Sequence, residues 1–100
     1  MKISIISTSH REKSESHRIS KILEQVISKI DSSIECFYLN MYDKKIPLWG
    51  GEKKNNLKFW NIEFVKISSN LASSDGFIIV VPEYGGMATP NAKNFFLLFN

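Results

Sequence analysis

A polar loop near the start of the chain carries the first side chains that could bind a ligand. It follows a short apolar run and combines hydroxyl groups with one arginine and two histidines (Ser7, Thr8, Ser9, Ser14, Ser16, Arg11, His10 and His17). Hydroxyls and the free amides of a helix start donate hydrogen bonds, and arginine adds a charge-assisted pair, so the loop suits a phosphate group. A capped helix start in a solvated loop explains the same composition about equally well. The GxxxxGKS/T and GxGxxG phosphate-binding patterns are absent.

A second loop, over residues 82–90, combines two glycines with an aromatic side chain. Gly85 and Gly86 let the backbone approach a flat ligand closely, and Tyr84 offers an aromatic face. The alternative is a tight turn that needs a positive φ at one of the glycines, with Tyr84 half-buried. Taken alone, the sequence of this loop favours a tight turn over a ligand-binding loop.

Other residues that often do chemistry fit structural roles better. No carboxylate or thiol cluster accompanies His10 and His17 at metal-ligand spacing, so we expect solvated loop histidines and no metal site. Cys36 lies within a strand pattern and is expected to be a buried, inert thiol. Trp49 and Trp60 are expected to be packing residues.

Three short β-rich runs position the two loops. We predict strands over residues 2–7, 34–39 and 76–81, and the first and third are expected to be covered on both faces because their apolar residues are consecutive. Each of the two polar loops directly follows a strand. In open parallel sheets, ligands bind beyond the carboxyl ends of the strands, where both loops would lie.

Helical patterns separate the predicted strands. Residues 40–56 form a long connection in this interpretation, and Thr89-Pro90 predicts an N-cap followed by proline at the first helical position. Strands alternating with helices predict a parallel α/β sheet. Apolar residues recur at helical spacing in two segments, which are 19–30 (Ile19, Ile22, Leu23, Val26, Ile27, Ile30) and 57–71 (Leu57, Trp60, Phe64, Ile67, Leu71).

Length and composition restrict the class of protein. The 100 residues make one domain at most, and 43% hydrophobic with 23% charged residues is ordinary globular composition. A net charge of +3, with basic runs no longer than pairs, argues against a nucleic-acid partner. One cysteine permits no internal disulfide, and no apolar run approaches the ~18 residues that span a bilayer. We therefore expect a cytoplasmic protein without a membrane partner.

Both loops together resemble one family, the NADPH-dependent FMN reductases, which include azoreductase- and quinone-reductase-type enzymes. Residues 8–14 are similar to the family's G-S-x-R-x-x-S pattern after the first strand, and residues 82–86 to its P-E-Y-x-G pattern. Lys93 and Asn94 match a K-N pair in the helix that follows. The resemblance covers nearly the whole chain, although Thr8 replaces the usual glycine and Pro90 lies one residue later than is common.

The resemblance implies a flavodoxin-like fold, a doubly wound parallel sheet, with FMN and NADPH or NADH as cofactors. A nicotinamide would give hydride to the flavin, and the reduced flavin would pass electrons to a quinone, azo or similar acceptor, with no catalytic side chain. Alternatives are a non-catalytic flavin-binding or assembly subunit and an inactive truncated fragment. By resemblance, one group of residues would bind the FMN phosphate (Ser9, Arg11, Ser14, Ser16) and another would hold the isoalloxazine ring (Pro82, Glu83, Tyr84, Gly85, Gly86).

The resemblance also bears on the completeness of the sheet. The flavodoxin-like strand order is 2-1-3-4-5, and this chain supplies only 2-1-3. Residues 1–100 are therefore expected to form a partial FMN-binding domain in which strands 4 and 5 are absent and strand 3 is an open edge. A homodimer, or a partner that completes the sheet, would then be expected.

Overall fold

The computed structural model describes residues 1–44, 46–51 and 56–99. The elements in chain order are β1 (Lys2–Ser7), α1 (Glu15–Ile30), β2 (Glu35–Asn40), α2 (Met41–Lys44), the π-helical segment η2 (Phe59–Glu63), α3 (Phe64–Ala72), β3 (Gly76–Val80), β4 (Glu83–Tyr84), β5 (Met87–Ala88) and α4 (Pro90–Leu98).

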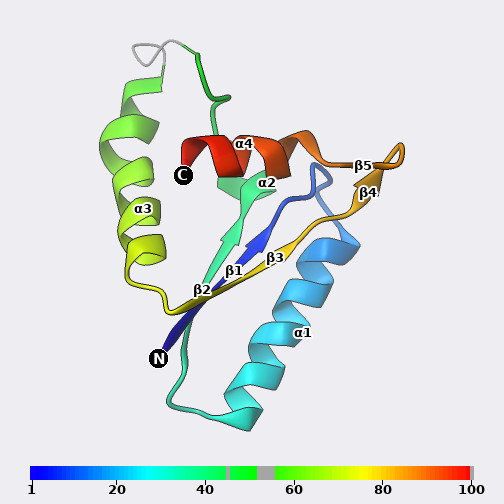
Figure 1. Cartoon of the computed structure of the whole chain (residues 1–100), viewed down its shortest axis with the longest axis vertical. Coiled ribbons are helices and arrows are strands. Elements are labelled where there is room, and N and C mark those ends of the chain that lie inside the picture. Colours follow the sequence, from blue (N-terminus) through cyan, green and yellow to red (C-terminus); the bar gives the residue numbers. More distant parts are fainter. Residues whose placement is uncertain (45, 52–55, 100) are drawn as a thin grey trace.

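Three of the strands form one parallel sheet in the order β2-β1-β3 (Figure 1). The predicted first strand is confirmed over Lys2–Ser7, β2 begins and ends one residue later than predicted, and β3 ends one residue earlier. Ile5 and Ile6 of the central strand β1 are fully buried, which confirms that this strand is covered on both faces. The order 2-1-3 is that of the first three strands of a flavodoxin-like sheet.

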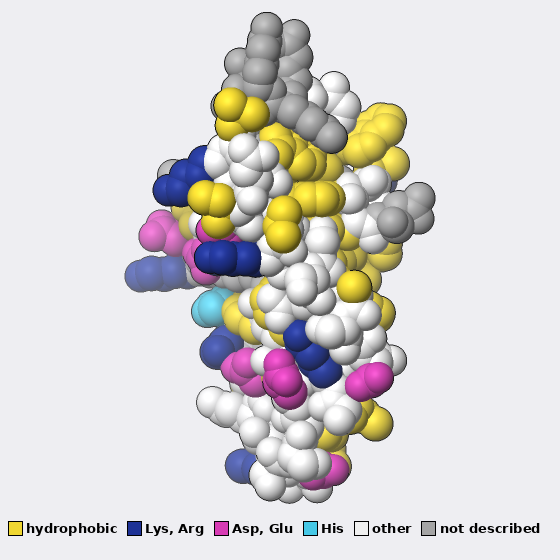
Figure 2. All heavy atoms as spheres, turned by 90° about the vertical axis from the view of Figure 1, so that its left-hand side faces the viewer, with side chains coloured by type: hydrophobic (Ala, Val, Ile, Leu, Met, Phe, Trp, Pro, Cys, Tyr) yellow, Lys and Arg dark blue, Asp and Glu magenta, His cyan; other side chains and the backbone are white. Residues whose placement is uncertain are grey.

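Helices cover both faces of the sheet, with α1 on one side and α3 and α4 on the other (Figure 1). The main core lies between the sheet and the second pair of helices, where Ile6 and Leu39 meet Phe59, Ile67 and Phe95. The side of the molecule that α3 forms shows hydrophobic side chains among charged ones (Figure 2). No helix in the described ranges is long and apolar enough to cross a membrane.

The apolar stripe predicted over residues 19–30 is helical, but most of it is not buried. Ile19, Ile22, Val26 and Ile30 are 41–77% exposed, whereas the buried residues of α1 are Ser16, Ser20 and Ile27. Small serine side chains let the helix lie close to the sheet, and the Ser20 hydroxyl donates to the Ser16 carbonyl at 2.7 Å.

β3 lies at the edge of the described sheet and none of its residues is fully buried, so the prediction that it is covered on both faces is wrong. Phe77 is 53% exposed, and Val81 just beyond the strand is 41% exposed. The reason is topological, because β3 pairs with β1 on one side and no fourth parallel strand occurs within residues 1–44, 46–51 and 56–99. The open edge that the resemblance implied is the arrangement found.

Four elements were not predicted from the sequence, namely α2, η2, β4 and β5. The connection over 40–56 contains α2, although Lys45 and residues 52–55 lie outside the described residues. The second loop contains the hairpin β4–β5. The helix predicted from Leu57 contains a π-helical turn over Phe59–Glu63, where the Phe64 amide donates to the Phe59 carbonyl five residues earlier. Phe59, Trp60 and Phe64 pack against one another there, with ring centroids 5.1–6.2 Å apart.

Candidate functional site

Two buried threonines join the first loop to the end of β3 and the start of α4. The Thr8 amide and hydroxyl both donate to the Val80 carbonyl, at 3.1 and 2.9 Å. The Thr89 hydroxyl donates to the Thr8 carbonyl at 2.8 Å and accepts from the Ala92 amide at 3.0 Å. Because β1 and β3 are parallel neighbours, their carboxyl ends share one edge, and these bonds hold the two loops together there.

Ser9 and Tyr84 carry the contact between the predicted phosphate loop and the predicted ring loop. Their hydroxyl oxygens lie 3.3 Å apart, and the His10 amide donates to the Tyr84 oxygen, also at 3.3 Å. Ser9 is buried, and its hydroxyl accepts from the Arg11 amide at 3.0 Å. The structure therefore places the two loops side by side on one edge of the sheet.

His10 adds a second connection that the sequence did not indicate. It is exposed, as expected, but its Nε2 accepts from the Asn91 amide at 3.0 Å, and its ring lies 5.9 Å from that of Tyr84. The Asn91 side chain also donates to the Ser9 carbonyl at 3.3 Å. His10 is therefore the exposed loop histidine that the sequence predicts, and it also attaches the first loop to the start of α4.

His17 also differs from its prediction as a loop residue. It lies in the first turn of α1, and its Nδ1 is 2.6 Å from the Tyr38 hydroxyl of β2 and 3.5 Å from the Asn40 amide nitrogen. Burial raises the pKa of Tyr38 above its ordinary value. No group of three or more potential metal-ligating side chains occurs among the residues that the structure describes.

The start of α1 presents the donors that an anion requires. Ser14 is the N-cap, and its hydroxyl accepts from the His17 amide at 3.0 Å. Glu15 would repel an anion, but Arg18 binds its carboxylate at 2.6 Å and lowers the pKa of Glu15 through that hydrogen bond and its charge. Arg11 is exposed on the loop before the helix. Helix-start amides, with an exposed guanidinium on the preceding loop, fit a phosphate group.

The predicted ring loop is a β-hairpin whose turn has two residues. Gly85 and Gly86 have φ values of 60° and 79°, so the predicted need for a positive φ is confirmed. The Glu83 carboxylate accepts from the Gly86 amide at 2.7 Å and closes the turn. A Cβ placed on Gly85 would meet no atom within 4 Å, which leaves that side of the backbone open to a flat ligand. Pro82 and Tyr84 are half-buried.

The buried Asn94 of α4 attaches the long connection to this end of the molecule. Its side-chain oxygen accepts from the Trp49 amide at 2.7 Å, and its nitrogen donates to the Pro47 carbonyl at 3.0 Å. The Trp49 side chain is 59% exposed, so its prediction as a packing residue is wrong. Trp60 does pack against its aromatic neighbours in the core.

The predicted site residues divide into three sets in the structure. Ser9 and Tyr84 are in contact, Arg11, Ser14 and Ser16 follow along the first loop into α1, and the remaining four form or precede the hairpin (Pro82, Glu83, Gly85, Gly86). Ser16 is buried. The residues that connect the loops but were not proposed as site residues are Thr8, His10, Thr89 and Asn91, of which the N-cap pattern at Thr89 was the one visible signal.

A parallel sheet in the order 2-1-3, helices on both faces and two polar loops at its carboxyl edge define a flavodoxin-like α/β protein. Comparison with protein families then places the chain more narrowly. The family model for NADPH-dependent FMN reductase matches residues 1–100, and the chain belongs to this family. A search of curated proteins found no match. Family membership indicates an oxidoreductase of the NAD(P)H-dependent flavin reductase type.

Proposed function

We propose that the chain binds FMN at the carboxyl edge of the sheet, with the phosphate at the first loop and the ring at the hairpin. The observation that carries the proposal is the contact of Ser9 with Tyr84, because it joins a loop suited to phosphate to a loop suited to a flat ring. The family match supports the same cofactor. Residues 1–100 would then form a partial FMN-binding domain of a cytoplasmic oxidoreductase.

In this proposal the protein binds and orients, and no side chain needs to act as acid, base or nucleophile. When bound, FMN would supply hydride chemistry between NADPH or NADH and a quinone, azo or similar small-molecule acceptor. The Arg11 guanidinium and the free amides at the start of α1 would bind the phosphate, helped by the hydroxyls of Ser9, Ser14 and Ser16. Tyr84 and the backbone of the hairpin would hold the ring.

Replacing Arg11 tests the phosphate half of the site. Arg11→Ala removes an exposed cation, so folding should not change, but FMN should bind roughly tenfold or more weakly because a charge-assisted hydrogen bond contributes about 1.5–3 kcal/mol. The measurement is a flavin-fluorescence titration with FMN and, separately, with riboflavin. Riboflavin lacks the phosphate, so its affinity should stay the same.

Lys66→Ala is the matched control, because Lys66 is an exposed cation on α3, a different element. This variant should bind FMN as the unaltered chain does. Equal weakening of FMN and riboflavin by Arg11→Ala, or no weakening at all, would contradict the assignment of the phosphate to the first loop.

A non-catalytic flavin-binding or assembly subunit is the second candidate function. The uncovered edge of β3 favours it, because that edge offers a place where another polypeptide would complete the sheet. Adding NADPH without oxygen to the FMN-loaded chain separates the candidates. Bleaching of the flavin absorbance supports the reductase, whereas a bound flavin that stays oxidised supports the subunit, and a chain that binds no flavin excludes both.

A further inference from the structure

The His10 side chain joins the first loop to the first turn of α4. Its Nε2 accepts a hydrogen bond from the Asn91 amide at 3.0 Å. The amides at the start of a helix have no partner within the helix, and side chains commonly cap them. The first residue of α4 is Pro90, which has no amide proton, and the Ala92 amide is capped by the Thr89 hydroxyl. The imidazole of His10 therefore caps the one amide between them.

His10 also contacts the tyrosine that is proposed to hold the flavin ring. The His10 amide donates to the Tyr84 hydroxyl oxygen at 3.3 Å, and the two ring centroids are 5.9 Å apart. The neighbouring Ser9 places its hydroxyl 3.3 Å from the same oxygen, and its carbonyl accepts from the Asn91 side chain at 3.3 Å. Asn91 thus binds two consecutive residues of the first loop, and both of these residues contact Tyr84.

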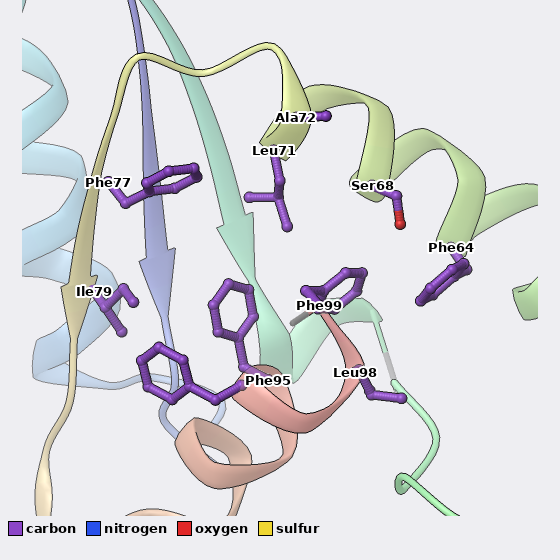
Figure 3. Close-up of a pocket in the computed structure, with 10 residues that line it drawn as sticks. Phe64, Ser68, Leu71, Ala72, Phe77, Ile79, Phe95, Leu98 and Phe99 are labelled. Carbon is purple, nitrogen blue, oxygen red and sulfur yellow. The ribbon is translucent and has the colours of Figure 1, made fainter.

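The helix α4 is a firm support for these contacts because its apolar residues pack into the core. Phe95 is 6% exposed and belongs to the main core cluster together with Leu71 of α3. Figure 3 shows Phe95 and Phe99 lining an apolar cavity between α4, α3 and Ile79 of β3. The core therefore fixes α4, and His10 attaches a polar loop to this fixed helix.

The protonation state of His10 determines whether its contact with α4 can form. A neutral imidazole has one nitrogen that accepts a hydrogen bond, whereas an imidazolium donates at both nitrogens and cannot accept from the Asn91 amide. The positive end of the helix dipole at the start of α4 also repels an imidazolium. Histidine is the side chain whose charge ordinarily changes between pH 5 and 8. Acid in this range should therefore break the contact.

We propose that His10 is a positioning residue for the flavin ring, an inference that rests on the proposed FMN site. The neutral imidazole, bound to the Asn91 amide, fixes the backbone and ring of His10 against Tyr84, and Tyr84 holds the isoalloxazine. Protonation removes the bond to α4, so Tyr84 loses its support and the ring binds more weakly. Flavin affinity should therefore fall as the pH falls.

The other titratable and charged side chains on the elements around His10 are of types that ordinarily titrate outside pH 5 to 8. They are Tyr84 and Glu83 on the hairpin, Lys93 on α4, and Arg11, Glu12 and Lys13 on the first loop. The Glu83 carboxylate is bound to the Gly86 amide at 2.7 Å. A pH dependence of ring binding in this range therefore points to a histidine, and the chain has only two.

The first test is a fluorescence titration with riboflavin at about pH 7.5 and at about pH 5.5, on either side of the ordinary histidine transition. Riboflavin lacks the phosphate group, which itself gains a proton near pH 6. The unaltered chain should bind riboflavin about threefold or more weakly at the lower pH, which is the cost of one hydrogen bond. His10→Gln places an amide that does not titrate near the position of Nε2, so its affinity should stay high at both pH values. His10→Ala has no acceptor and should bind weakly at both.

His17→Gln is the matched control, because His17 is the other histidine and contacts Tyr38 instead of Tyr84. This variant should keep the pH dependence of the unaltered chain. A flat pH profile in the unaltered chain, or an equal fall in affinity for His10→Gln, overturns the positioning role and leaves the proposed FMN site intact. Failure to bind either riboflavin or FMN at both pH values overturns the proposed function, and this inference with it.

The second test follows the Asn91 amide by NMR in the flavin-free chain. Its chemical shift should change with pH in parallel with the ring protons of His10, because the amide loses its acceptor when the imidazole is protonated. In His10→Gln the Asn91 amide signal should not move over the same pH range. An Asn91 amide that does not respond while the His10 ring titrates overturns the contact and the positioning role that depends on it.

Discussion

Thr8 departs from the family pattern, but its side chain keeps the first loop attached to β3. The pattern that residues 8–14 resemble has glycine at this position, and a side chain that pointed outward there would hold the backbone away from a phosphate. Instead, the Thr8 hydroxyl donates to the Val80 carbonyl within the protein. A hydroxyl that is buried and bonded adds an attachment of the loop to β3. Thr8 therefore has a structural role in place of the glycine. The groups proposed to donate hydrogen bonds to the phosphate follow it in the chain.

Gly86 should be intolerant of substitution, unlike Gly76. Its φ of 79° lies in the left-handed region, where a side chain costs about 1–2 kcal/mol. Gly86→Ala should therefore lower the free energy of unfolding by about 1 kcal/mol, measured by urea denaturation. Gly76→Ala is the control, because Gly76 has an ordinary φ and open space around a Cβ, and its effect should stay within about 0.5 kcal/mol. Equal effects would mean that the hairpin does not need the positive φ.

Cys36 should react slowly with alkylating reagents. Burial, and after it the charge of Glu24, raises the pKa of the thiol, so at pH 8 less of the reactive thiolate is present than in a free cysteine. The iodoacetamide rate should rise in urea to that of a free thiol, and its pH midpoint in the folded chain should lie above the ordinary value. Equal folded and unfolded rates would show that the half-buried position of Cys36 does not protect it.

At the scale of elements, the sequence predicts strands better than it predicts what covers them. Consecutive apolar residues located β1 and β3, because a run such as Phe77–Val81 has few alternatives. The same run could not show that β3 lies at an edge, since burial depends on which elements are adjacent. The apolar stripe located the helix α1 correctly but did not show which side of it is buried, since the small residues Ser16 and Ser20 are buried on the side turned toward the sheet.

Thr89 should contribute more to stability than Ser14, the N-cap of α1. Both side chains accept from a helix-start amide, and losing that bond costs about 1 kcal/mol. Thr89 also donates to the buried Thr8 carbonyl, so Thr89→Ala should lower the free energy of unfolding by roughly 2–3 kcal/mol, against about 1 kcal/mol for Ser14→Ala. Chemical denaturation measures both. Thr89→Ser should keep most of the stability that Thr89→Ala loses. Equal losses for the two alanine variants would contradict a contribution from the hydrogen bond of Thr89 to the Thr8 carbonyl.

At the scale of the whole molecule, topology is what allowed the candidate site to be predicted. Two loops that are about 70 residues apart in sequence could be assigned to one site because parallel neighbouring strands end at the same edge. The order 2-1-3 confirms that adjacency. Their direct contact through Ser9, His10 and Tyr84 was beyond prediction, since it depends on side-chain conformations within irregular loops.

If both loops bind one molecule, FMN should stabilise them together. A ligand at a hundred times its dissociation constant adds about 2.7 kcal/mol to the free energy of unfolding. Amide hydrogen exchange should therefore slow over residues 8–16 and 83–89, with smaller changes in β2. Riboflavin should protect mainly the hairpin, and inorganic phosphate mainly the first loop. Protection of only one loop by FMN itself would show that the two do not share a ligand, because simultaneous binding requires both to become ordered around it.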